Sequence, residues 1–219
     1  TCVGREQNLF SETTGNAYCV MFNSPILLFS DFNQLLGLDS TNYRANTVDL
    51  NYDGHETLEQ AIHRITDEAE RLARSGTTLL ILSDRAVDKN AQVIPAAMAV
   101  GAVQRRLVDK SLRCDTNIIV ETASARDPHH FAVLLGFGAT AIYPYLAYES
   151  IAAMAKQHAV EDITSLMLNF RYGIEKGLRK IMSKMGISTV GSYRCSQQFE
   201  AVGLASDVIE LCFKGVISR

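Results

Sequence analysis

Short runs of consecutive apolar residues, separated by segments with helical periodicity, limit the fold of this chain more than any other feature. Leu79 to Leu82, Ile118 to Val120 and Ala141 to Tyr143 are three such runs. A run of this kind is typical of a strand with both faces buried, as in a parallel sheet covered by helices. We therefore expect an α/β fold in which mostly parallel strands alternate with helices.

The segments between these runs carry the spacing and the end signals of helices. The clearest helix is expected from Glu56 to about Arg74, after a strand from Thr47 to Tyr52, because its apolar residues recur at helical spacing and Gly76 ends it. The remaining expected elements are helices at 95–112, 129–136, 161–185 (despite Gly173 and Gly177) and 196–202, with a short fifth strand at 189–190.

About five β/α units are too few to close an eight-stranded barrel. A degenerate or partial TIM-barrel-like sheet fits this number, and so does an open doubly wound sheet. Both arrangements place functional side chains at the carboxyl ends of the strands.

The first part of the chain lacks this periodicity. Pro25 pushes Ser24 toward an extended conformation, and a short helix capped by Ser30 or Asp31 is expected to end near Gly37. We therefore expect an irregular N-terminal connecting segment at 1–45 and an α/β domain at 46–219. Because the chain starts without Met, we interpret it as one excised domain of a larger polypeptide.

Composition argues against two classes of partner. The 21 basic and 24 acidic residues give a net charge of -3, whereas nucleic-acid binders present a clustered basic face. The longest apolar runs are shorter than the roughly 18 residues that a membrane-spanning helix needs. We expect neither nucleic acid nor a membrane as a partner.

The five cysteines are an odd number at wide spacing and include no C-x-x-C pair. This argues against a zinc or iron–sulfur site built within the chain. It also suits a reducing cytoplasm better than a disulfide framework. We expect Cys2, Cys19, Cys114, Cys195 and Cys212 to be small buried or half-buried side chains.

Polar residues follow three of the expected strands, where functional side chains collect in parallel α/β folds. The candidates are Ser83, Asp84, Arg85, Glu121, His129, His130, Tyr193 and Arg194. One hypothesis is an active site in which His129 or His130 is a general base. The alternative is that these side chains cap helices, pair with one another or meet a partner domain. The alternative is favoured, since no nucleophile motif or metal pattern accompanies them.

Two further features have simpler interpretations. Cys2 suggests an N-terminal-nucleophile amidotransferase. We reject this interpretation, because Thr1 precedes Cys2 and the pattern that follows is parallel α/β. Residues 136–139 have the spacing of a fragmentary phosphate loop, yet they follow a helix and precede a strand. A helix C-cap explains them better.

Several stretches form one further pattern that runs through the whole chain in order. They are residues 4–10, 23–27, 80–85, 94–103, 129–132, 136–139 and 143–147, then the most specific block, 180–189, and finally 192–194, 199–204, 215 and 218–219. Together they resemble the central domain of the glutamate synthase large subunit, of the bacterial NADPH-dependent type. Cys195-Ser196 favours that type, with ferredoxin- and NADH-dependent relatives left open.

The resemblance implies a multidomain enzyme that converts glutamine, 2-oxoglutarate and NADPH to two glutamates. In it a glutaminase domain releases ammonia, which passes internally to an FMN-binding barrel. Electrons arrive from NADPH through a small subunit, with FAD and iron–sulfur clusters. No residue of this chain matches the catalytic, FMN-binding or cluster-binding motifs, so we expect no catalytic residue, cofactor or metal here.

For the eight candidates, the resemblance implies a domain interface or the wall of an ammonia path, which needs hydrogen-bonding groups and exclusion of bulk water. The implied partners are the glutaminase and FMN-binding domains and the small subunit. The competing hypothesis is a free-standing small α/β enzyme with its site at the same rim. A partner-binding module is close to the first hypothesis, because its partners would be covalently attached.

Overall fold

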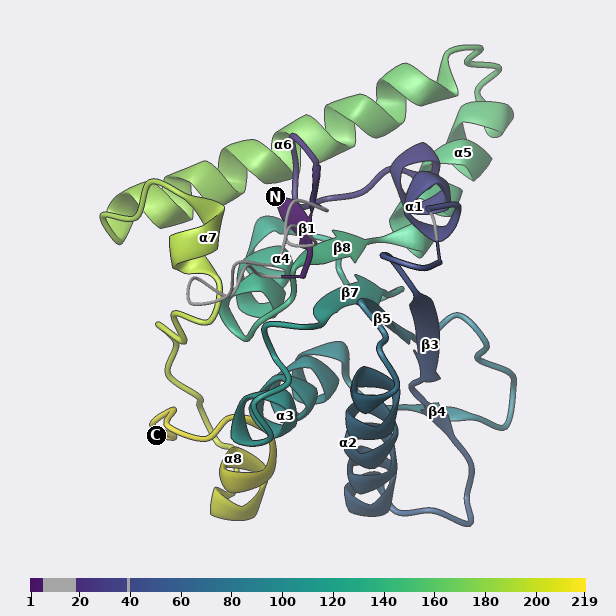
Figure 1. Cartoon of the computed structure of the whole chain (residues 1–219). Coiled ribbons are helices and arrows are strands. Elements are labelled where there is room, and N and C mark those ends of the chain that lie inside the picture. Colours follow the sequence, from purple (N-terminus) through teal and green to yellow (C-terminus); the bar gives the residue numbers. More distant parts are fainter. Residues whose placement is uncertain (6–18, 39) are drawn as a thin grey trace.

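The computed structural model describes residues 1–5, 19–38 and 40–219, and a parallel four-stranded sheet lies at its centre (Figure 1). The strands are β3 (Ala45–Asp49), β5 (Leu79–Ser83), β7 (Asn117–Glu121) and β8 (Ala141–Tyr143), adjacent in that order. All three strand pairs are parallel. The expected α/β class is confirmed.

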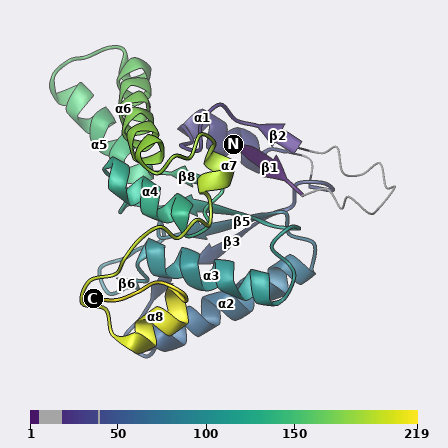
Figure 2. The same cartoon turned by 90° about the vertical axis from the view of Figure 1, so that its left-hand side faces the viewer.

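Three helices connect consecutive strands and cover one face of the sheet. They are α2 (Leu58–Arg74), α3 (Ala96–Asp109) and α4 (Pro128–Gly136). Apolar side chains from this face of the strands, such as Leu82 and Val120, share one core cluster with all three helices. Figure 2 shows α2 and α3 on this side, with α1 and the β1–β2 pair on the other.

The opposite face is covered by the N-terminal part of the chain. Antiparallel β1 (Cys2–Gly4) and β2 (Cys19–Met21) lie there with α1 (Phe29–Leu36). Phe32 of α1 stacks on Tyr143 with ring centroids 4.6 Å apart, and Leu79, Ile81 and Ile119 belong to the same core cluster. The resembling stretch at 4–10 lies mostly outside the described residues.

The fifth parallel position of the sheet is filled from the N-terminal segment. Ile26 pairs with Ile142 of β8 in parallel, and α1 follows it. The strand expected at 189–190 is wrong. Thr189 instead caps the short helix α7 (Val190–Tyr193), because its hydroxyl accepts a hydrogen bond from the backbone N–H of Ser192.

The helix expected at 196–202 is also wrong. Gln197 has a φ of 49°, which a right-handed helix excludes, and the flanking residues Cys195 and Gly203 also have positive φ values, of 63° and 72°. The backbone N–H groups of Cys195 and Gln197 donate instead to carbonyls at the end of α4. The last helix is α8 (Ser206–Cys212), which the sequence pattern did not indicate.

Two helices extend from the sheet beyond β8, namely α5 (Tyr145–Gln157) and the long α6 (Ile163–Lys184) (Figure 1). The position of α6 confirms the expected helix at 161–185, whereas α5 was not expected. The strand expected at 47–52 is divided between β3 and β4 (Asn51–Tyr52), and β4 pairs antiparallel with β6 (Gln92–Val93).

The cysteines differ from expectation. Cys2 and Cys19 form a disulfide between β1 and β2, because the antiparallel pair brings their Cα atoms to 6.4 Å. Cys114 and Cys195 are exposed, so the prediction of burial holds only for Cys212 among these three. Burial raises the pKa of the Cys212 thiol to about 12.

Gly177 marks the place where α6 crosses the start of α4. A Cβ atom at Gly177 would come within 2.4 Å of the Pro128 ring, while a Cβ at Gly173 would meet no atom within 4 Å. The crossing therefore requires glycine at Gly177 and not at Gly173.

Gly177→Ala is expected to lower the free energy of unfolding by about 1–3 kcal/mol, because the added methyl group overpacks the crossing. Gly173→Ala is the matched control and should raise it by about 0.5–1 kcal/mol through helix propensity. Urea denaturation of both variants measures the difference. Equal shifts in the two variants would contradict this crossing.

Candidate functional site at the carboxyl edge of the sheet

Three neighbouring strands end at one edge of the sheet with a polar side chain at the last residue. Ser83 of β5, Glu121 of β7 and Tyr143 of β8 are paired in register. The carboxyl edge of a parallel sheet is where α/β proteins bind ligands. We call Ser83, Asp84, Arg85 and Glu121, with the side chains that they contact at this edge, the rim network.

Glu121 is a buried carboxylate held by two partners. The Ser83 hydroxyl donates to it at 2.7 Å, and an Arg85 Nη atom lies 3.6 Å away. The other Nη of Arg85 lies 2.6 Å from Glu149 of α5, and the guanidinium sits 4.6 Å above the Tyr145 ring. Partial burial acts to lower the pKa of Arg85, but Glu149 and Glu121 outweigh it and the pKa is raised.

Asp84 is the second buried carboxylate of the rim network. The Thr122 hydroxyl donates to it at 2.6 Å, and the backbone N–H of Ala123 donates to both of its oxygens at 3.0 and 3.1 Å. These bonds compensate for its desolvation. Burial raises the pKa of Tyr145, and the negative charge of Asp84 raises it further.

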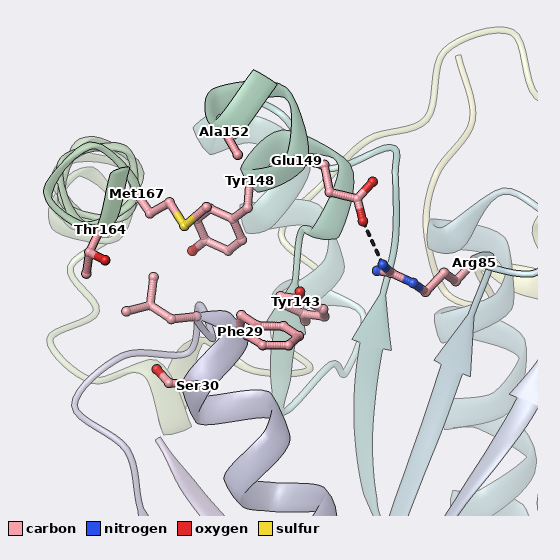
Figure 3. Close-up of a pocket in the computed structure, with 10 residues that line it drawn as sticks. Phe29, Ser30, Arg85, Tyr143, Tyr148, Glu149, Ala152, Thr164 and Met167 are labelled. Carbon is pink, nitrogen blue, oxygen red and sulfur yellow. Dashed lines mark hydrogen bonds and ion pairs between the residues drawn. The ribbon is translucent and has the colours of Figure 1, made fainter. Parts of the chain in front are cut away.

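A cavity of about 420 Å³ opens beside the rim network, between α1, α5 and α6 (Figure 3). Its lining is mainly apolar and aromatic: Leu28, Phe29, Ser30, Arg85, Tyr143, Tyr148, Glu149, Ala152, Thr164 and Met167. Tyr148 is only 2% exposed, and its buried hydroxyl has no hydrogen-bond partner among the described residues. Such a group is costly to leave unpaired.

His129 and His130 lie outside the rim network, at the start of α4. Asp127 caps that helix by accepting hydrogen bonds from the backbone N–H groups of both histidines. Desolvation acts to raise the pKa of Asp127, but these bonds outweigh it and the pKa is lowered. The two imidazoles line a separate cavity of about 490 Å³ with Arg126. The hypothesis that either histidine is a general base stays a prediction.

Tyr193 and Arg194 are also placed away from the rim network. Tyr193 is fully buried in the core, and its hydroxyl has no hydrogen-bond partner within the described part of the chain. Two residues later, the backbone N–H of Cys195 donates a hydrogen bond to the carbonyl oxygen of Leu135. Leu135 lies near the carboxyl end of α4, from which the chain returns to the amino edge of the sheet. Their expected position depended on the strand at 189–190, which is absent.

Four further residues at this edge and its cavity were not among the candidates from the sequence pattern. Tyr143 and Tyr145 flank Pro144 directly after a strand, a position that could have indicated them. Glu149 follows Tyr145 by one helical turn, but α5 was not expected. The Tyr148 hydroxyl, which has no partner among the described residues, is buried by the packing of α5 against α6 and has no signal in the sequence.

The rim network is built from hydrogen bonds and ion pairs among polar side chains. No group of three His, Cys, Asp or Glu side chains that could hold a metal occurs at 1–5, 19–38 or 40–219. Over the same residues, no helix has both the length and the apolar character to cross a membrane.

Asp84→Asn is expected to cost about 1–3 kcal/mol of stability, because an amide NH₂ would face the N–H and O–H donors that the carboxylate now accepts from. Glu149→Gln is the control: it breaks an exposed ion pair and should cost at most about 1 kcal/mol. Urea denaturation at neutral pH compares them. A larger cost for Glu149→Gln would contradict the assignment of the buried contacts.

The protein should lose stability at alkaline pH through Tyr145 and Tyr148. Burial raises the pKa of both hydroxyls above the ordinary value of about 10. Above that pH the unfolded chain releases protons that the folded chain keeps, so the free energy of unfolding falls as pH rises. Tyr148→Phe should flatten this decline above about pH 10 in urea denaturation series. An unchanged slope would contradict the burial of Tyr148.

Comparison with known proteins identifies the family that this chain resembles. A family model described as the glutamate synthase central domain matches residues 1–205. The large chain of the NADPH glutamate synthase of Bacillus subtilis is 39% identical over 224 residues, covering 100% of this chain and 14% of its own length. The NADH glutamate synthase of Saccharomyces cerevisiae is 32% identical over 231 residues, covering 99% and 11%.

Solved structures give a weaker likeness. A flavocytochrome b2 variant with sulfite bound aligns with a TM-score of 0.47 and 14% identity, over 84% of this chain and 43% of that chain. The present chain spans 14% or less of the length of the two glutamate synthases named here. The match of the family model covers most of the chain, and the chain therefore belongs to the glutamate synthase central domain family.

Proposed function

We propose that this chain is the central linking domain of a bacterial NADPH-dependent glutamate synthase large subunit. The observation that carries the proposal is the family match over residues 1–205. The NADPH type is supported by 39% identity to the Bacillus subtilis large chain, against 32% to the NADH enzyme of Saccharomyces cerevisiae and 35% to the ferredoxin enzyme of Pyropia yezoensis.

In this proposal the parent enzyme works in the cytoplasm and converts glutamine, 2-oxoglutarate and NADPH to two glutamates. FMN, iron–sulfur clusters and, through the small subunit, FAD belong to other parts of that enzyme, and so do the chemical steps. The described residues of this chain do not fit a cluster, because Cys114, Cys195 and Cys212 come from separate parts of the fold and no metal-holding group forms among them.

In the linking role, the rim network would contact a neighbouring domain or line an internal path. Ser83, Asp84, Arg85 and Glu121 form a fixed row of donors and acceptors at the edge where α/β domains meet ligands and partners. Such a row suits the wall of an internal ammonia path or an interface with the FMN-binding domain. Because the carboxylates are already satisfied, the row can be covered without leaving a buried charge unpaired.

The other four candidates have lesser places in the proposal. His129 and His130 face a second cavity and fit contact with the glutaminase domain or another neighbour. Arg194 and the buried Tyr193 support α7 and the end of α4. Residues 1–45 form the connecting segment, and 46–219 the body of the domain. The alternative of a free-standing enzyme is not favoured by the comparisons.

The test is made in the full-length enzyme. Arg85→Ala leaves both buried carboxylates in place but removes the exposed cation of the rim network, so glutamine hydrolysis should continue while less glutamate forms per glutamine consumed. Arg105→Ala, which breaks an exposed ion pair with Asp109 on α3, is the control. Parallel assays of glutamine loss and glutamate formation measure the coupling. Unchanged coupling in Arg85→Ala would contradict a role of this edge.

A further inference from the structure

The cavity beside the rim network has the size and chemistry of a small-molecule site. Ligand pockets typically enclose about 300–1,000 Å³ and combine an apolar lining with a few convergent polar groups. This cavity measures about 420 Å³. Its apolar wall includes Phe29, which is 60% exposed although it lies at the start of a helix that packs on the sheet. An exposed aromatic side chain in a concave site is available for ligand contact.

One end of the cavity holds a cation and an anion side by side. Arg85 and Glu149 are 46% and 52% exposed and their closest atoms are 2.6 Å apart. An exposed pair of this kind contributes little stability, so a ligand can replace it at small cost. Arg85 would keep its orientation, because Glu121 and the face of the Tyr145 ring hold it from the other side.

Such a pair matches a zwitterion. A guanidinium binds a carboxylate through two parallel hydrogen bonds, and a carboxylate binds an ammonium group. A free α-amino acid carries both groups on one carbon atom, at a spacing comparable to that of a close ion pair. A ligand with only one of these charges would leave either Arg85 or Glu149 without its present partner.

The other end of the cavity offers an unused hydrogen bond. Figure 3 shows Tyr148 and Thr164 on the side away from Arg85, with Met167 between them. The Tyr148 hydroxyl is buried and has no partner among the described residues. Burial raises its pKa, so it remains a neutral donor at physiological pH. The unbranched Met167 side chain can shift to admit a polar group.

We propose that this cavity binds a free α-amino acid with a hydroxylated aromatic side chain, of the L-tyrosine class. Its carboxylate lies on Arg85 and its ammonium group on Glu149. Its ring packs against Phe29 and Met167, and its phenol oxygen accepts the hydrogen bond of Tyr148. The site goes beyond the linking role, since it is complete within this chain.

The test is a titration of the 219-residue chain with four probes, in which binding is measured from changes in NMR chemical shifts. The probes are L-tyrosine, L-phenylalanine, tyramine, which lacks the carboxylate, and 3-(4-hydroxyphenyl)propionate, which lacks the ammonium group. L-tyrosine should bind most tightly, and each probe that lacks a charge should bind at least about tenfold more weakly. Equal affinity for all four probes, or no saturable shift at the cavity, would overturn the proposal.

Two variants separate the two ends of the site. Tyr148→Phe should weaken the binding of L-tyrosine by about threefold to tenfold and leave the affinity for L-phenylalanine unchanged. Glu149→Gln should weaken the binding of both amino acids to the same extent and leave the affinity for 3-(4-hydroxyphenyl)propionate unchanged. Thermal melts confirm that each variant is folded. The assignment of these two contacts is wrong if Tyr148→Phe weakens the binding of both amino acids equally. It is also wrong if Glu149→Gln weakens the binding of neither. Failure here leaves the linking role intact, because that role is tested by coupling in the full-length enzyme.

Discussion

The parallel pairing across the middle of the sheet is the constraint on which the rest of the structure depends. Val48, Leu82, Val120, Ile142 and Ile26 form one continuous row of register partners from β3 to the N-terminal segment, and all five are fully buried. A shift of one residue in a strand would exchange the side chains that its two buried faces present, so each would meet packing partners that it does not fit. The same register fixes which residues stand together at the carboxyl edge.

Burial at that edge determines which contacts are fixed and which can change. Asp84 and Glu121 are buried, but hydroxyl and backbone groups donate hydrogen bonds to them and Arg85 forms an ion pair with Glu121, so they act as rigid parts of the edge. Arg85 and Glu149 are exposed, and their pairing is weak enough to be exchanged. The edge therefore combines a preorganised inner layer with an adaptable outer layer, which suits both an interface and a ligand site.

The amino-acid sequence predicts the elements whose signal is local and misses those decided by tertiary contacts. Buried strands such as 79–82 are recognisable because both faces are apolar, and the rule that parallel strands end at one edge is enough to group Ser83, Asp84, Arg85 and Glu121. The pattern around Thr189 predicts a strand, although this residue is a helix cap. The conformation at 195–203 depends on hydrogen bonds to the end of α4, which no local pattern contains. The Cys2–Cys19 bond likewise depends on the pairing of β1 with β2.

If the carboxyl edge of this domain faces the rest of a longer polypeptide, as we propose, the neighbouring domain should protect it from solvent. Backbone hydrogen exchange, compared between this chain alone and the full-length protein, measures this protection. We expect slower exchange in the full-length protein at 84–90 and 122–126, after β5 and β7, with no change in the exposed first turn of α2. Equal exchange at the edge in the two forms would mean that the edge is a free surface and would contradict a role in the contact between domains.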